Sequence, residues 1–230
     1  EGGRVEPDHR GIDVIEVGGR RRVEVDILGQ QHGVADRAAD VPGGKIVAGQ
    51  GSINQTNPNL TVINQASQNL AIDWQTFNIK KNQTVHFKQP GAKASALNNI
   101  FDQNPSQIFG SLKANGRVYL MNPNGIIFGA NSRVSVGGLV ASGLRADVQE
   151  FMAGRLKLQG VTDSAGMVVN QGLIEAATGG SVTLVGKSVR NEGVILANAG
   201  QVNLLAGNKV AIDFDGDGLI KFAVEEGVLD

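Results

Sequence analysis

The acidic run near residue 215 has the residue types of a calcium-binding loop. Its carboxylates stand at alternate positions, as the first ligands of an EF-hand do, and Ca²⁺ prefers oxygen ligands. The twelfth position of such a loop requires a bidentate Glu, but Val224 occupies it, and residues 209–212 and 221–224 have the composition of strands. A polar hairpin turn is therefore the favoured interpretation, with calcium binding as the alternative. The carboxylates concerned are Asp213, Asp215 and Asp217.

Acid–base or nucleophilic catalysis would need titratable groups that converge on one face. Acidic residues are sparse between Gly43 and Ala211, and His86 is the only histidine after residue 32. His86 lies in the alternating run Thr84–Lys88, which is typical of a strand with one solvated face. No Ser/His/Asp set, phosphate-binding loop or HExxH motif occurs. The sequence therefore predicts no enzyme and no cofactor, with a polysaccharide-active β-helix enzyme as an alternative.

The pentapeptide Asn122–Ile126 is a third polar group, and its first four residues read Asn-Pro-Asn-Gly. Pro fixes φ at the second position of a type I turn, and Gly accepts a positive φ. We therefore expect a tight turn between two apolar segments. A similar quartet, Asn-Pro-Asn-Leu, stands at Asn57–Leu60, where a turn at a strand edge is the simplest interpretation.

The composition favours an architecture with many turns. Gly accounts for 32 of 230 residues and aromatic residues for only 4%, while 41% apolar residues are enough to bury a core. The net charge is −1 and no Lys/Arg cluster is interleaved with aromatic residues, so nucleic acid is not an expected partner. The absence of Cys excludes disulfides and thiolate metal sites. No membrane-spanning run or signal peptide is recognisable, so we expect an exported chain in its mature form.

Short apolar segments recur from Gly43 onward at intervals of about twenty residues, which is a solenoid spacing. Gly180-Ser-Val-Thr-Leu returns as Gly200-Gln-Val-Asn-Leu, and a second motif that begins at Asn170 returns at Asn191. An upstream copy at Gly116 lies 64 residues before Gly180, which predicts three periods of about 21 residues.

Each period predicts two or three short strands, with Val, Leu and Ile facing inward and Asn or Gly at the corners. We expect Asn170, Asn191 and Asn208 at corners, because Asn tolerates a left-handed backbone and pairs with its counterpart between rungs. At about 21 residues per rung and about 4.8 Å between strands, residues 43–230 predict about nine rungs and a rod about 43 Å long.

Two segments are expected to interrupt the rungs. Asp147–Gly154 has an acidic start, helix formers and a terminal Gly, which predicts a short helical turn that projects from the rod. Ser95–Ser111 is expected to be an excursion or an added strand pair instead of a regular rung.

The first part of the chain differs in composition. Residues 1–41 hold six Arg, nine acidic residues and no Lys. We assign residues 1–42 to a charged extension of uncertain origin, with a hairpin around Gly18-Gly19. Residues 43–230 are expected to form one domain.

Four ordered motifs resemble the amino-terminal secretion domain of two-partner-secretion (TPS) exoproteins. These are the filamentous-haemagglutinin-like and high-molecular-weight adhesins, and the resemblance runs from about Gly43 to the C-terminus. The motifs are Ile72–Ile79, Pro105–Gly110, Asn122–Ile126 and Val136–Ser142.

The resemblance implies an all-β fold, a right-handed parallel β-helix (single-stranded solenoid) with short extra-helical β elements and an N-terminal cap. It implies that the domain begins a large secreted protein of a Gram-negative bacterium. The implied partner is an outer-membrane TpsB-type β-barrel transporter, which recognises the domain through its periplasmic POTRA domains. The domain would then act as a secretion address and would nucleate β-helix folding at the cell surface. We expect a monomer.

The resemblance also assigns site residues. The secretion motif is carried by Asn122, Pro123, Asn124, Gly125 and Ile126. A second family quartet matches Asn57, Pro58, Asn59 and Leu60, but it lies before Trp74, closer to the amino end than the family places it. Trp74 and Phe77 are expected to pack in the core or cap instead of forming a binding platform.

A host-binding adhesin domain in its own right is the alternative function. Solenoid faces bind partners well, but a glycan or protein platform would need exposed aromatic residues, and the chain has one Trp and one Tyr. We expect the parent protein to be an adhesin or haemagglutinin that contacts the host cell surface through its downstream region.

Overall fold

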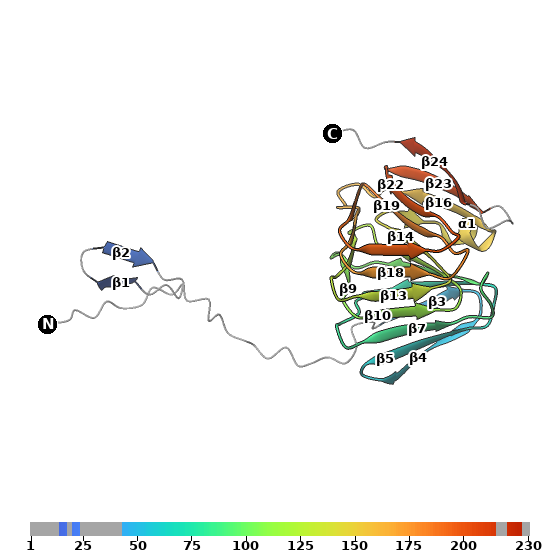
Figure 1. The fold of residues 1–230 in the computed structure, drawn as a ribbon, viewed down its shortest axis with the longest axis horizontal. Coiled ribbons are helices and arrows are strands. Elements are labelled where there is room, and N and C mark those ends of the chain that lie inside the picture. The colour runs from blue at the N-terminus through green and yellow to red at the C-terminus, as the bar shows by residue number, and fades with distance from the viewer. Residues whose placement is uncertain (1–13, 18–19, 24–42, 215–219, 227–230) are drawn as a thin grey trace. The chain divides into compact units, whose positions relative to one another are not determined.

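The chain divides into two compact units, Glu1–Arg37 and Ala38–Asp230. In the first unit, β1 (Val14–Val17) and β2 (Arg20–Val23) pair antiparallel, which confirms the hairpin predicted around Gly18-Gly19. Residues 211–214 and 220–226, like these two strands, are described by their backbone alone. The computed structural model describes residues 14–17, 20–23, 43–214 and 220–226 (Figure 1).

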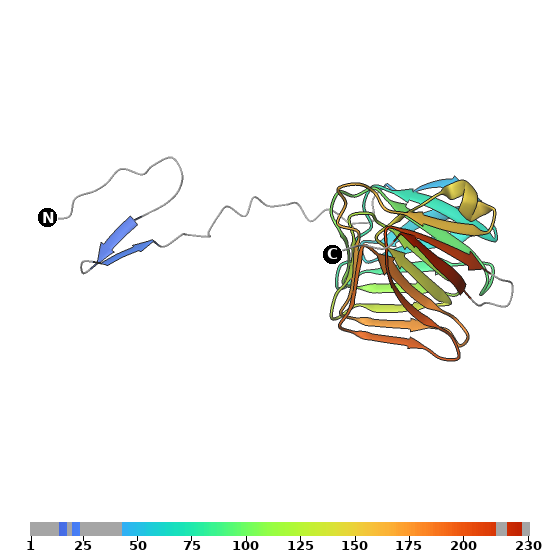
Figure 2. The same cartoon turned by 90° about the horizontal axis from the view of Figure 1, so that it is seen from above.

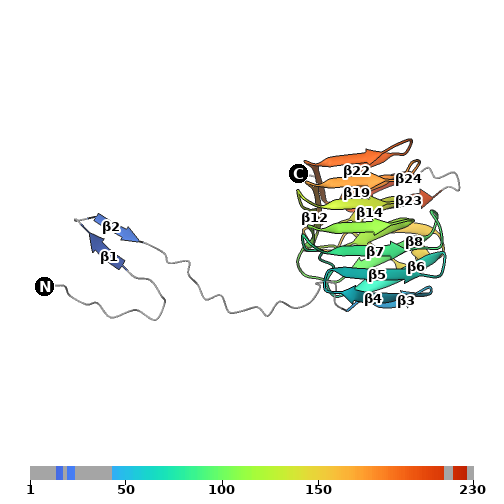
Figure 3. The same cartoon turned by 60° about the horizontal axis from the view of Figure 1, so that its bottom comes forward.

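The second unit is a parallel β-helix, in which each strand pairs with its counterpart in the next rung (Figures 1 and 3). The first face consists, in spatial order, of β21 (Val194–Ala197), β18 (Leu173–Ala176), β13 (Arg133–Val136), β10 (Ser111–Ala114), β7 (Thr84–Lys88), β5 (Leu60–Gln65) and β4 (Gly51–Asn57). The second face consists of β22 (Val202–Ala206), β19 (Val182–Gly186), β14 (Gly138–Ser142), β11 (Arg117–Met121), β8 (Ser95–Ile100), β6 (Asn69–Trp74) and β3 (Lys45–Ala48). The third face is shorter and consists of β20 (Ser188–Asn191), β17 (Met167–Asn170), β12 (Ile126–Phe128) and β9 (Ser106–Ile108). The predicted parallel β-helix is confirmed.

The amino-terminal end of the β-helix is closed by two strands of opposite direction. β4 pairs antiparallel with β5, and β3 pairs antiparallel with β6. Ile46 and Ile53 on these strands pack against the interior core. The expected N-terminal cap is therefore present.

Alternating apolar residues fill the interior of the β-helix. On β7, Val85 and Phe87 point inward and are buried, while His86 between them lies on the outer side. Trp74 and Phe77 meet edge to face with ring centroids 5.3 Å apart, and both are buried as predicted. Trp74 Nε1 donates to Asn98 Oδ1 at 2.9 Å, so the one polar atom of the indole is satisfied inside the core.

A second core lies outside the β-helix, on the outer side of the second face. It is covered by a four-stranded antiparallel sheet, which we call the outer sheet. Leu156, Leu158 and Val210 from the outer sheet are buried there against Leu97 and Val140. The outer sheet consists of β15 (Arg145–Ala146), β16 (Arg155–Gln159), β23 (Lys209–Phe214) and β24 (Ile220–Glu226).

The predicted helical turn exists as α1 (Val148–Met152). Asp147 is its N-cap, since Asp147 Oδ1 accepts a hydrogen bond from the Glu150 N–H at 2.8 Å, and Gly154 ends the segment with φ +82°. The prediction that it projects from the rod is wrong, because Phe151 is 4% exposed and packs edge to face on Tyr119. Figure 2 shows the helix lying against the strands of the second unit. No helix in the described ranges is long and apolar enough to cross a membrane.

The interpretation of Ser95–Ser111 as an excursion is also wrong. Its residues form β8 and β9, which pair in parallel with β11 and β12 of the next rung. All six residues of β8 are buried, because the interior covers one side of this strand and the second core covers the other. A strand buried on both sides loses the apolar–polar alternation from which a rung is recognised.

The predicted count of nine rungs is too high. The first and second faces have seven strands each, of which the cap contributes one. Gly116 and Gly180 are two rungs apart instead of three, because β11 pairs with β14 and β14 pairs with β19. Residues 145–159 leave the β-helix between those rungs and join the outer sheet, so they add chain length without adding a rung.

Four glycines form a column at one corner, one in each of four successive rungs. Gly137 N–H donates to the Gly116 carbonyl at 2.8 Å. A Cβ at Gly180 would collide with the Gly137 carbonyl oxygen, and one at Gly200 would collide with that of Gly180. The repeated Gly of the sequence motif is thus required by the close approach of stacked backbones.

The predicted asparagine pairing between rungs is confirmed at one corner, where Asn170 Nδ2 donates to Asn191 Oδ1 at 2.8 Å. The left-handed backbone expected there is absent, because Asn170 and Asn191 lie in strands β17 and β20. Asn208 is not part of this column; its carbonyl accepts from Gly160 N–H at 2.6 Å beside the outer sheet.

We expect Gly180→Ala to lower the free energy of unfolding by about 2 kcal/mol or more, because the new methyl group overlaps backbone that cannot move independently. Urea denaturation of the domain measures this. Gly91→Ala is the matched control, since a Cβ there meets nothing within 4 Å, and its effect should stay within about 0.5 kcal/mol. Equal stability of the two variants would contradict the role of the column.

Candidate functional site

Asn122–Ile126 forms the corner between β11 and β12. Gly125 N–H donates to the Asn122 carbonyl at 2.9 Å, which closes the predicted β-turn, and Gly125 has φ +115°. A side chain at Gly125 would also press on Met167, whose Cγ lies 2.9 Å from the ideal Cβ position. Gly is therefore required at this position for both its backbone conformation and the space available.

The Asn122 side chain is fully buried and joins this corner to the preceding rung. Its Nδ2 donates to the Asn104 carbonyl at 3.1 Å and to Ser106 Oγ at 3.0 Å. Its Oδ1 accepts from Asn124 N–H at 2.9 Å. The backbone N–H of Asn122 donates to the Ser142 carbonyl on the following rung at 2.9 Å, so one residue links three rungs.

The rest of the pentapeptide is also largely enclosed. Pro123 is buried and its carbonyl accepts from Gly166 N–H at 2.8 Å, while Ile126 is part of the interior core. Asn124 alone among the five residues is partly exposed, and its Nδ2 donates to the Asp102 carbonyl at 2.8 Å. The pentapeptide therefore acts first as a structural corner, and Asn124 is its accessible residue.

Sequence reasoning missed the partners of this corner in the segment Asp102–Ser106. A signal for them exists, because Asn104-Pro105 precedes Asn122-Pro123 by 18 residues. The register places Ser106 beside Ile126, so the two Asn-Pro pairs belong to neighbouring rungs. The spacing is shorter than the assumed period of about 21, and this concealed the repeat.

The second quartet lies elsewhere. Asn57–Leu60 forms the exposed hairpin between β4 and β5, in which Asn57 Oδ1 accepts from Asn59 N–H at 2.9 Å. The carbonyl of Asn59 accepts from Thr84 N–H at 2.8 Å, which anchors the hairpin to β7. β5 belongs to the first rung and β11 to the third, so the two quartets do not form one site.

The strand assignment around the candidate calcium loop is confirmed, since β23 and β24 pair antiparallel on either side of it. Asp213 ends up opposite Lys221 in this pairing. Asp215 and Asp217 lie outside the described residues. Within the described ranges, no group of three or more His, Cys, Asp or Glu side chains is placed to hold a metal ion.

His86 lies on the solvated side of β7 as predicted, in register with Lys113 on β10. Partial burial, together with the positive charges of Lys88 and Lys113, lowers the pKa of His86. The two charged neighbours that shift the pKa of His86 are thus both cationic.

We expect Asn122→Ala to lower the free energy of unfolding by about 2–3 kcal/mol, because it removes a fully buried amide and takes a hydrogen-bond partner from the buried Ser106 hydroxyl, the Asn104 carbonyl and the Asn124 N–H. Asn124→Ala loses one half-exposed hydrogen bond and should lower it by about 1 kcal/mol. Urea denaturation distinguishes the two. A larger loss of stability for Asn124→Ala than for Asn122→Ala would contradict the prediction that the more buried side chain contributes more to stability.

Comparison with known proteins gives one family. The model of the TPS secretion domain matches residues 38–225. The crystal structure of the HMW1 secretion domain from Haemophilus influenzae superposes with a TM-score of 0.74 at 33% identity, covering 83% of this chain and 50% of that chain.

Curated relatives agree with this assignment. A heme/hemopexin-binding protein of Haemophilus influenzae (strain ATCC 51907 / DSM 11121 / KW20 / Rd) is 36% identical over 203 residues, which is 84% of this chain and 22% of the relative. A second heme/hemopexin-binding protein of Haemophilus influenzae is 42% identical over 98 residues, 43% of this chain and 11% of that protein. The chain thus spans less than a quarter of the length of these relatives. Together these matches confirm the resemblance: the chain belongs to the TPS secretion domain family.

Proposed function

We propose that this domain is the secretion address of a longer exoprotein and is recognised by a TpsB-type outer-membrane transporter through its periplasmic POTRA domains. The observation that carries this proposal is the match of residues 38–225 to the TPS secretion domain, because two-partner secretion implies a dedicated transporter. The route leads through the periplasm and the outer membrane of a Gram-negative bacterium to the cell surface or the medium. The domain acts as a monomer.

The corner Asn122–Ile126 supports a specific division of labour within this function. Because Asn122, Pro123 and Ile126 are buried, a folded domain presents only Asn124 of this motif to a partner. The buried residues set the shape of the corner. The transporter contacts Asn124 and the segments that are hydrogen-bonded to the corner. The exposed hairpin Asn57–Leu60 is a second candidate contact.

The last rung supports a role in nucleating the β-helix. Val202 and Leu204 are in register with Val182 and Leu184, which are fully buried in the interior, yet they are 46% and 48% exposed. After β22 the chain leaves the β-helix to form β23 on the outer sheet. The inward side of this rung is therefore uncovered, and a further rung that emerges from the transporter would bury it.

The activity of the whole exoprotein is a separate question. The relatives that match are named for heme and hemopexin binding, which supports such an activity for the longer protein rather than the adhesin or haemagglutinin role expected from the resemblance. The family is a secretion domain and not an enzyme family. For host binding by this domain alone, the aromatic platform is weak, because Trp74 and Tyr119 are buried.

The secretion address is tested by export of this domain, fused to a signal peptide, in cells with and without its transporter. We expect the domain in the medium only when the transporter is present, and at least about tenfold less for Asn124→Ala. Immunoblotting of medium and periplasm measures this. Asn203→Ala is the matched control, because Asn203 is also half-buried and donates one side-chain hydrogen bond, to Thr183 at 3.1 Å.

Release that does not depend on the transporter would overturn the proposal. Normal export of a folded Asn124→Ala domain would leave the secretion address standing and remove Asn124 from it.

The nucleation role is tested in the full-length exoprotein with Leu204→Asp. A carboxylate on the inward side of the last rung should slow the appearance of protease-resistant protein at the cell surface, because the next rung cannot bury a charge there. Pulse-chase labelling with protease treatment measures the rate. Leu196→Asp is the control, since Leu196 is 43% exposed but aligns with Glu175 on the outer side, and an equal delay in both variants would count against templating.

A further inference from the structure

We propose that the transporter docks on the surface formed by Phe101, Arg145 and the groove that Arg145 shares with the outer sheet. This inference rests on the proposed function, since it assigns contact residues to the same partner. The occupant is a segment of the periplasmic POTRA region that presents a carboxylate next to an apolar side chain.

Phe101 is held in an exposed position by its backbone. Its N–H donates to the Trp74 carbonyl at 2.9 Å, which fixes the residue at the end of β8, while its side chain is 50% exposed. Arg145 on β15 places its guanidinium carbon 5.2 Å from the centroid of the Phe101 ring. A cation is attracted to the face of an aromatic ring, and aromatic residues and Arg are both enriched in protein–protein interfaces.

The positive charge of Arg145 is not neutralised by an ion pair with any described residue. Among the described residues, no carboxylate lies within ion-pair distance of its guanidinium. Its planar guanidinium can donate two parallel hydrogen bonds to a carboxylate while it remains stacked on the ring. A partner that brings an acidic side chain to this point would complete a site that is now half formed.

The secretion motif holds the loop that follows Phe101. Asn124 Nδ2 donates to the Asp102 carbonyl at 2.8 Å, and Asn122 Nδ2 donates to the Asn104 carbonyl at 3.1 Å. These bonds fix the loop directly after Phe101. A motif that is itself buried can therefore control recognition by setting the position of an exposed neighbour.

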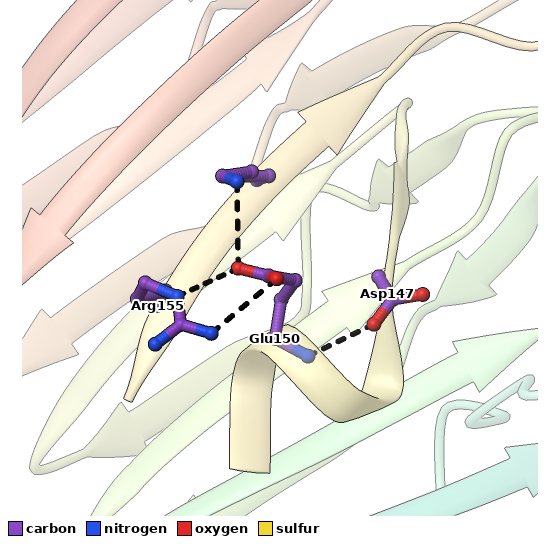
Figure 4. A network of polar contacts seen from close by, with 4 residues as sticks. Asp147, Glu150 and Arg155 are labelled. Atoms are coloured by element: carbon purple, nitrogen blue, oxygen red, sulfur yellow. Dashed lines mark hydrogen bonds and ion pairs between the residues drawn. The ribbon is translucent and has the colours of Figure 1, made fainter. Parts of the chain in front are cut away.

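The groove adjoining Arg145 has a volume of about 470 Å³ and lies between β15, α1, β16 and β23. Two carboxylates line it, Asp147 and Glu150. Asp147 Oδ1 accepts from the Glu150 N–H at 2.8 Å, and the Glu150 carboxylate is paired, since Arg155 Nε lies 2.7 Å and Lys157 Nζ 3.5 Å from Glu150 Oε2 (Figure 4). The hydrogen bond from Arg155 is the main cause of a lowered pKa of Glu150, so this carboxylate stays charged and occupied. Three cationic residues, Arg145, Lys157 and Lys209, line the groove against these two carboxylates, and this balance favours an acidic segment of the partner.

The other exposed large apolar residues of the described ranges are less suited to bind this partner. Val194, Leu196, Val202 and Leu204 lie on the last rung, and Val47 lies on the cap strand β3. Phe109 is 40% exposed, but it follows β9 and is held by Ile79 instead of by the motif. Among the described residues, Phe101 is thus the exposed aromatic residue that is followed by the loop bound to Asn122 and Asn124.

The test measures binding of the purified domain to the isolated POTRA region of its transporter by calorimetry. We expect Phe101→Ser and Arg145→Glu each to raise the Kd at least about tenfold, with thermal unfolding unchanged, because both side chains are exposed. Phe109→Ser, which removes a similarly exposed ring, should leave the Kd within about twofold. Phe101→Leu keeps an apolar side chain without the ring and should have an intermediate Kd.

Two failures can be told apart. Wild-type binding with unchanged Kd values for Phe101→Ser and Arg145→Glu would overturn the docking surface and leave the secretion address intact. No binding by the wild type, together with export that does not need the transporter, would overturn both. A Kd that Phe109→Ser raises as much as Phe101→Ser does would reduce the effect to general loss of apolar surface and would also overturn the inference.

Discussion

Parallel pairing between successive rungs is the constraint on which the rest of this structure depends. Once a strand must lie beside its counterpart, its inward residues form columns, as Val134 and Ile174 do on the first face. The corners must then bring backbones together without side chains in between, which requires glycine at 116, 137, 180 and 200. Where a corner carries a polar residue, its amide must find partners in neighbouring rungs, as Asn170 does on Asn191. Stability is thus a sum over neighbouring rungs instead of a property of one central core.

The same constraint explains why the pentapeptide Asn122–Ile126 is so deeply buried. Asn122 satisfies groups on the rung before it and donates to the rung after it, so the corner cannot change without disturbing both. Under the proposed function, this corner would link folding to recognition, because a domain that has not stacked these rungs does not present Asn124 or the loop after Phe101 in the same way. Defects in secretion caused by changes at Asn122 therefore report on the shape of the corner as much as on contact with a partner.

The outer sheet adds a second principle, because it gives the β-helix a face that is not repetitive. Residues 145–159 leave the rungs, and their strand β16 pairs with β23, which pairs with β24 (Figure 1). Tyr119 and Leu97 are buried in the second core beneath this sheet. The groove and Arg145 belong to this addition. A uniform solenoid offers the same surface at every rung, whereas this insertion marks one place on it. Specific recognition is easier at such a place, because a partner has only one register in which to bind.

Local residue patterns were enough to predict the inward-facing residues of β7 and the turn at Asn122–Gly125, because both depend on residues that are close in the chain. Repeated motifs were enough to predict the period, and four ordered motifs were enough to predict the family. The number of rungs could not be predicted, because Gly137 and Gly180 of neighbouring rungs are 43 residues apart in the sequence, which is about two periods. Periodicity therefore cannot distinguish the insertion from an additional rung. β8 could not be recognised from the sequence either, because both of its sides are buried and it therefore lacks the alternation of apolar and polar residues. The burial of Asn122 and the exposure of Phe101 beside Arg145 are visible in the tertiary structure and could not be predicted from the sequence. Burial and pairing between distant segments depend on how the rungs stack, and local residue patterns do not encode that stacking.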